Sequence, residues 1–131
     1  MNNELKESLA QATNGLIYMS ETDAAIEPFE GGPAEAATAE NLLAQIGAAG
    51  DSPVGERGFE EIFARLTRVY DGGGEEQATR AGRFAELKTL MEANLTDLKV
   101  FKIGRVNVDI YMVGIDGEGN LSGVKTHAVE T

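Results

Sequence analysis

The sequence predicts an α+β fold, an α/β/α sandwich in which about four helices cover a central, mainly antiparallel sheet. Apolar residues repeat every three to four positions through most of the first 95 residues, as they do on amphipathic helices. Beyond residue 95 the apolar period changes to two, which is typical of strands. Over 106–115 both faces of the expected strand become apolar, so helices should cover the sheet on both sides.

Four segments carry an apolar stripe at helical spacing. The predicted helices run over about 3–14, 38–46, 59–70 and 75–95. Thr38 is the expected N-cap of the second helix, and Gly72–Gly74 is expected to break the third. Gly82 either weakens the fourth helix by about 1 kcal/mol relative to Ala or marks a close contact.

The extended segments fall mainly at the end of the chain. Residues 100–103, 106–115 and 121–131 are predicted to form an antiparallel meander, joined by a hairpin turn at Gly104–Arg105 and a Gly-rich loop at 116–120. Residues 26–30 form a short extended piece, which Pro28 confines to a sheet edge or a strand end. The Gly- and Pro-rich stretches 31–38 and 51–58 are expected to be loops. Without an internal repeat or a long polar linker, residues 1–131 should form a single domain.

Composition excludes several classes of protein. The chain has no cysteine, which excludes disulfides, thiolate zinc sites and thiol catalysis. No apolar run approaches the roughly 18 residues of a membrane span, and the first residues lack the basic and apolar regions of a signal peptide. We therefore expect a cytoplasmic protein that does not bind a membrane.

The net charge of −11 is concentrated in the first half of the chain. Residues 1–61 hold 12 acidic and 2 basic side chains, whereas residues 62–131 hold 10 acidic and 9 basic ones. Such a field repels nucleic acid and attracts cationic clefts, including those that bind nucleic acid. A negative charge also keeps a protein soluble, so charge alone does not show whether this protein binds a cationic partner.

Searches for catalytic and cofactor motifs give nothing. His127 is the one histidine, and no nucleophile stands on a strained turn of the kind that a Ser/His/Asp triad needs. Asp116, Glu118 and Asn120 begin like a calcium loop, but Leu121 stands where that loop needs glycine. We expect no enzyme activity, no cofactor and no metal of the protein's own.

Two places remain as candidates for binding. A dense apolar group at 16–19 gives way abruptly to a polar cluster, and β-branched residues continue to Thr131, so the terminus should be ordered. The carboxylate of Glu21 and a terminal carboxylate are hard oxygen ligands for a divalent cation. They suit an inhibitor that occupies the metal centre of another protein. The candidate partner-binding residues are Ser20, Glu21, Thr22, Asp23, Glu130 and Thr131.

An alternative from a different class is an acidic adaptor. It would bind some other basic protein through the surface of residues 21–40, where Glu30, Glu35 and Glu40 supply negative charge. Its binding would not depend on the C-terminus.

Several segments together resemble the nuclease A inhibitor family, small proteins that block sugar-non-specific nucleases of the ββα-metal type. The resemblance covers nearly the full chain and is carried by residues 15–21, 59–65, 104–114, 119–123 and 129–131. The chain departs from the family at 24–25 and 71–75, where small residues stand in place of acidic and aromatic contact residues.

The resemblance implies an α/β/α sandwich and a mechanism. In the family, a glutamate in a Met-Ser-Glu segment and the C-terminal threonine reach the catalytic Mg²⁺ of the nuclease and replace part of its water shell. These residues correspond here to Glu21 and Thr131. The implied protein is monomeric before it forms the complex, binds a nuclease and does not itself bind nucleic acid.

Overall fold

The computed structural model describes residues 1–47, 53–69 and 71–130. The helices there are α1 (Asn3–Thr13), α2 (Ala39–Ile46), α3 (Phe59–Leu66) and α4 (Gly74–Asn94). The strands are β1 (Ile17–Tyr18), β2 (Ala24–Ala25), β3 (Glu27–Pro33), β4 (Val54–Gly58), β5 (Thr96–Ile103), β6 (Asn107–Ile115) and β7 (Asn120–Val129). No helix in these ranges combines the length and the apolar character needed to cross a membrane.

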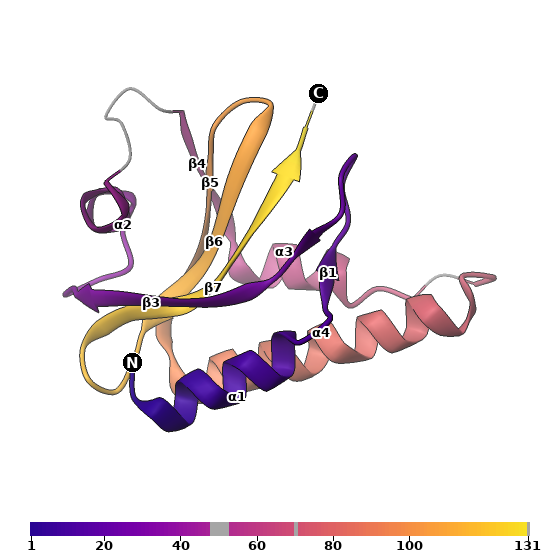
Figure 1. The fold of residues 1–131 in the computed structure, drawn as a ribbon, viewed down its shortest axis with the longest axis horizontal. Helices are drawn as coiled ribbons and strands as arrows, with labels where there is room; N and C mark the ends of the chain where they lie inside the picture. The colour runs from indigo at the N-terminus through magenta and orange to yellow at the C-terminus, as the bar shows by residue number, and fades with distance from the viewer. Residues whose placement is uncertain (48–52, 70, 131) are drawn as a thin grey trace.

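Helices cover both faces of a five-stranded antiparallel sheet with the order β3-β7-β6-β5-β4. On one face, Leu9 of α1, Phe63 of α3 and Phe84 of α4 belong to one buried apolar cluster. On the other face, Leu42 of α2 packs in a second cluster with Phe101 of β5. Figure 1 shows α1 and α4 on one side of the sheet and α2 on the other. The predicted α+β sandwich is therefore confirmed.

The central position of β6 explains its two-sided apolar pattern. Ile110 and Met112 face the cluster with α1, α3 and α4, while Val113 faces the cluster with α2. All three side chains are buried. Successive residues of a strand point to opposite faces of the sheet, so both faces of β6 contact a buried cluster. The expected meander of β5, β6 and β7 is present, and its register pairs Val113 with Gly123.

The sheet has more strand than the sequence predicts, and two of the additions lie in the edge strands β3 and β4. Residues 54–58 were expected to be a loop but form β4, which pairs with β5. Gly31–Pro33, also expected to be loop, continues β3. The side chain of Gln45 accepts from the Gly32 N–H at 2.8 Å and donates to the Gly32 carbonyl at 3.1 Å, which fixes this extension. The pairing partners are distant in sequence, so local pattern does not reveal them. Pro28 does lie on an edge strand, as expected.

The predicted helices are present with shifted ends. Thr38 caps α2 as expected, since its hydroxyl accepts from the Asn41 N–H. The third helix was expected to reach residue 70 but ends at Leu66. There the hydroxyl of Thr67 donates to the Phe63 carbonyl at 2.6 Å, and such side-chain bonds compete with helix continuation. Strand β5 begins at Thr96, whereas a start at residue 100 was expected, and β7 ends at Val129. Residue 70, the expected end of the third helix, and residue 131, the expected end of the last strand, lie outside the described residues.

Candidate functional site

The short hairpin of β1 and β2 presents residues 19–23, here called the hairpin loop. Ile17 pairs with Ala25 and Tyr18 with Ala24. Tyr18 is buried, and its hydroxyl accepts from Nη2 of Arg65 at 2.9 Å. The apolar half of the segment thus anchors it, while Glu21 and Asp23 are exposed.

One hydroxyl fastens the hairpin loop to the end of β7. Oγ of Ser20 accepts from the Val129 N–H at 3.1 Å, across 109 residues of sequence. The same oxygen donates to the Thr22 carbonyl at 2.7 Å, which shapes the turn. Below it, the hydroxyl of Thr126 donates to the Ala25 carbonyl at 3.0 Å. The hairpin loop and the last residues of β7 are therefore held side by side (Figure 1).

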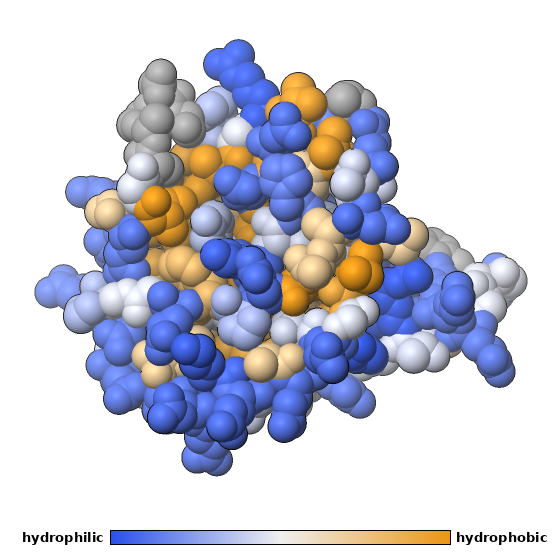
Figure 2. All heavy atoms as spheres, in the orientation of Figure 1, coloured by the Kyte–Doolittle hydropathy of each residue, from blue (hydrophilic) through white to orange (hydrophobic). Residues whose placement is uncertain are grey.

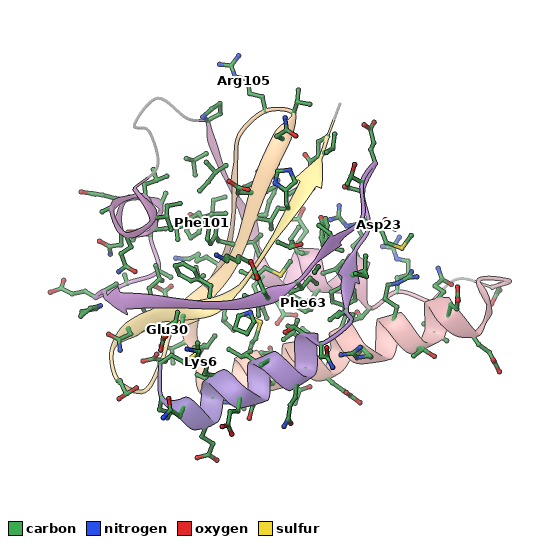
Figure 3. All side chains as sticks on the ribbon, in the orientation of Figure 1. Lys6, Asp23, Glu30, Phe63, Phe101 and Arg105 are labelled. Carbon is green, nitrogen blue, oxygen red and sulfur yellow. The ribbon has the colours of Figure 1, made fainter. Side chains whose placement is uncertain are left out.

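The turn between β5 and β6 completes this end of the molecule. The Glu130 N–H donates to the Val106 carbonyl at 2.8 Å, and Figure 3 shows Arg105 at the tip of the turn. We call the hairpin loop, residues 104–106 and residues 129–130 together the C-terminal edge. Met19 and Val106, 55% and 47% exposed, give it two apolar side chains on the surface. Figure 2 shows hydrophobic residues at this end among hydrophilic ones. Sequence reasoning missed residues 104–106; the apolar Val106 beside a hairpin turn was the available signal.

The predicted site residues have different positions on this edge. Ser20 is the structural link, and Glu21, Thr22 and Asp23 are exposed next to it. The carboxylate of Glu130 lies 2.8 Å from Nζ of Lys102, so its charge is paired within the protein. Thr131 lies outside the described residues. The described residues contain no cluster of His, Cys, Asp and Glu that could hold a metal ion. Glu21 and Asp23 place exposed carboxylates on this edge.

His127 lies on the face of the sheet that carries α2, in a part that α2 leaves open. It pairs with Asp109, and Nδ1 of His127 lies 3.0 Å from Oδ1 of Asp109. Two hydroxyl groups, those of Thr126 and Tyr111, line a hollow with His127. That of Thr126 is bonded to the Ala25 carbonyl. Burial, with the charge of Asp109, raises the pKa of Tyr111, so its phenol stays protonated at neutral pH. None of these contacts supports a catalytic role for His127.

Asp116 has a structural role in the β6–β7 loop. Its Oδ1 accepts from the backbone N–H groups of Glu118 and Asn120, and its Oδ2 accepts from the Ser122 hydroxyl at 2.7 Å. The ammonium group of Met1 lies 3.2 Å from Oδ2. These contacts engage both carboxylate oxygens and hold the loop that connects β6 to β7.

Comparison with known proteins gives one result. A family model described as "Nuclease A inhibitor-like protein" matches residues 3–131, nearly the whole chain. No curated protein matches the chain. The matched range includes the hairpin loop, the β5–β6 turn and the last strand.

Proposed function

The chain belongs to the nuclease A inhibitor-like family, and from this membership we propose that it inhibits a Mg²⁺-dependent, sugar-non-specific nuclease. The carboxylate of Glu21 and the C-terminal carboxylate of Thr131 enter the metal site of the nuclease. There they replace water and exclude the substrate phosphate. The metal belongs to the nuclease, and the inhibitor supplies only oxygen ligands.

One observation carries the joint use of the two groups. The hydrogen bond from the Val129 N–H to Oγ of Ser20 ties the hairpin loop to the strand that leads to Thr131. Glu21 follows Ser20 directly, and Thr131 follows Val129 by two positions. Because a chain extends by at most about 3.6 Å per residue, both groups lie within a few residues' reach of one bond. This proximity supports a single target for both.

The chemistry of the two groups suits Mg²⁺. Magnesium prefers oxygen ligands in octahedral geometry and keeps several waters, so an incoming carboxylate can replace a water without other rearrangement. Glu21 is exposed on the hairpin loop, where a partner can reach it. The hairpin loop that carries Glu21 is held by the hydrogen bond between Ser20 and Val129, which lowers the conformational entropy lost on association.

Charge supports the same partner class. A nuclease binds polyanions, so its cleft is cationic, and a protein of net charge −11 is attracted to it. Exposed Met19 and Val106 flank the acidic loop and add apolar contact area. Apolar side chains such as these are enriched in the buried core of protein interfaces.

Inhibition assays with a purified ββα-metal nuclease test the proposal. Glu21→Gln and deletion of Thr131 should each raise the inhibition constant about 30-fold or more, because removing one partner of a desolvated charge contact costs roughly 2–5 kcal/mol. Thermal unfolding should be nearly unchanged. Full inhibition by both variants would reject the mechanism.

Glu35→Lys is the matched control for charge. Glu35 is exposed and lies outside the C-terminal edge, so inhibition should change little. The acidic adaptor makes the opposite prediction, since it depends on the charges of residues 21–40 and ignores the C-terminus. Glu35→Lys and the Thr131 deletion together therefore separate the two functions, whereas Glu21→Gln does not, because Glu21 lies within residues 21–40.

A further inference from the structure

A hollow of about 300 Å³ lies between the β1–β2 hairpin, α3 and α4. Its lining includes Arg65 of α3, Arg68 just after α3, and Arg80 of α4, and no acidic side chain lines it in the part of the chain that the structure describes. We call it the arginine hollow. Three guanidinium groups on one surface of a chain with net charge −11 form a local field of opposite sign.

The floor of the arginine hollow is apolar. Ile17, Met19, Leu66 and Phe84 contribute to it, and Met19 is 55% exposed. A second hollow of about 490 Å³ shares Ile17, Met19 and Arg80 with the first, so the two form one groove. Such an open, partly apolar groove has the dimensions of a site that takes one or two side chains of another molecule.

The arginines differ in what they already bind. Nη2 of Arg65 donates to the Tyr18 hydroxyl at 2.9 Å, which fixes that side chain against the hairpin. Half-buried Arg80 forms no hydrogen bond or ion pair within residues 1–47, 53–69 and 71–130, so its donors remain available to a ligand. A guanidinium group binds a carboxylate through two parallel N–H donors. Arg80 is therefore the best-placed residue in the hollow to recognise an anion.

We propose that the arginine hollow docks an acidic segment of a partner protein. An apolar side chain of that segment packs on Met19 and Leu66, and a neighbouring carboxylate binds Arg80. A free phosphate or nucleotide would gain little from the apolar floor. An oligonucleotide would carry one phosphate charge per nucleotide past Asp23, Glu75 and Glu76 of the adjoining hollow, whereas this segment needs a single carboxylate at Arg80.

This docking surface goes beyond the proposed inhibition. It lies beside the C-terminal edge, with Met19 as the residue common to both, and it binds by opposite charge without a metal. An interface with an acidic half and a basic half would fix the orientation of a partner, because like charges disfavour the wrong orientation.

Fluorescence anisotropy with the full chain tests the proposal without any nuclease. The probe is a short labelled peptide in which Leu and Phe flank one Asp, because the groove takes one or two side chains. Arg80→Glu should weaken its binding at least about tenfold, which corresponds to 1.4 kcal/mol, and Arg80→Lys should weaken it less. Met19→Ser should also weaken it. Arg57→Glu is the matched control, because Arg57 is an exposed arginine of β4 outside the hollow.

Three results would overturn the docking proposal: no detectable binding of the peptide, equal binding by wild type and Arg80→Glu, or equal binding of a peptide with Ser in place of Leu and Phe. Displacement of the peptide by millimolar inorganic phosphate or by an oligonucleotide would instead identify a general anion site and would also reject it. Thermal unfolding of each variant checks the fold. None of these outcomes depends on whether the protein inhibits a nuclease.

Discussion

Ser20 connects the hairpin loop to the end of β7, two segments that are far apart in the sequence. Its hydroxyl oxygen accepts from the Val129 N–H and donates to the Thr22 carbonyl, so it both ties and shapes the hairpin loop. The bond lies near the surface, since Ser20 is half-buried. Its main effect should be on where Glu21 points and not on whether the domain folds.

Ser20→Ala should therefore weaken inhibition and leave stability almost unchanged. Loss of one hydrogen bond costs about 0.5–1.5 kcal/mol, so the inhibition constant should rise roughly two- to tenfold while the melting temperature stays within a few degrees. Thr89→Ala is the matched control, because the exposed hydroxyl of Thr89 also donates to a backbone carbonyl, that of Ala85 within α4, and lies outside the C-terminal edge. This variant should inhibit like wild type. A melting temperature that falls by ten degrees or more in Ser20→Ala would show that the bond belongs to the fold.

Asp116 illustrates the opposite case, a charge that serves stability. Burial alone would raise the pKa of Asp116, but the Ser122 hydroxyl, the N–H groups of Asn120 and Glu118 and the ammonium of Met1 outweigh it, and the pKa is lowered. The unfolded chain, with an Asp pKa near 3.9, then binds more protons in acid than the folded one. This stabilisation is present above pH 4 and is lost as the pH falls through the lower, folded pKa.

Asp116→Asn should lower the free energy of unfolding at neutral pH by about 1–3 kcal/mol, because it leaves buried polar groups poorly paired. The variant should also lose less stability than wild type between roughly pH 5 and pH 2. Urea unfolding at several pH values measures both effects. Glu118→Gln, an exposed carboxylate of the same loop, is the control and should stay within about 0.5 kcal/mol of wild type. Equal acid sensitivity in Asp116→Asn and wild type would contradict this role.

Among the elements, those with a strong local period were predictable. The stripe of α3 and the two-sided pattern of β6 come from contacts that each element makes with the core, and core contact selects apolar residues. β4 was missed because its residues, Val54–Gly58, include two glycines and two charges and lie at an exposed edge. Its conformation comes from backbone pairing with β5, which leaves no mark on side-chain pattern.

Gly82 was predicted either to weaken α4 or to mark a close contact, and the structure decides between the two. A Cβ atom at this position would meet nothing within 4 Å among the described residues, and Gly82 is exposed in the helix interior. Gly82→Ala should therefore stabilise the protein by about 0.5–1 kcal/mol, the difference in helix propensity. Chemical denaturation would show this as a higher midpoint with an unchanged slope. A lower midpoint would mean that the small side chain is needed for packing.

In the whole molecule, the site was only partly predictable. The abrupt change from apolar to polar residues at the hairpin loop pointed to Glu21 and Asp23, because an anchored turn exposes its polar end. The arginine hollow could not be seen, since Arg65 and Arg80 come from two helices whose contact is tertiary. The β5–β6 turn itself was predicted, but its place in the site was not, because only the fold brings Val106 to Glu130.

The net charge makes a prediction about association. If the partner cleft is cationic, the association rate constant should fall at least about tenfold between roughly 50 mM and 500 mM NaCl, because salt screens long-range attraction. The dissociation rate constant should change less, since short-range contacts are screened less. Stopped-flow mixing at several salt concentrations measures both. An association rate that is insensitive to salt would show that the acidic first half serves only solubility.

The central claim is that Glu21 and Thr131 act on one metal ion, and a double-mutant cycle tests this most directly. Inhibition constants would be measured for wild type, Glu21→Gln, the Thr131 deletion and the combined variant against one ββα-metal nuclease. Ligands of a shared ion should be coupled, so the two free-energy losses should differ from additivity by about 1 kcal/mol or more. Losses that add within about 0.3–0.5 kcal/mol, as for independent sites, or a wild-type protein that does not inhibit, would contradict the account.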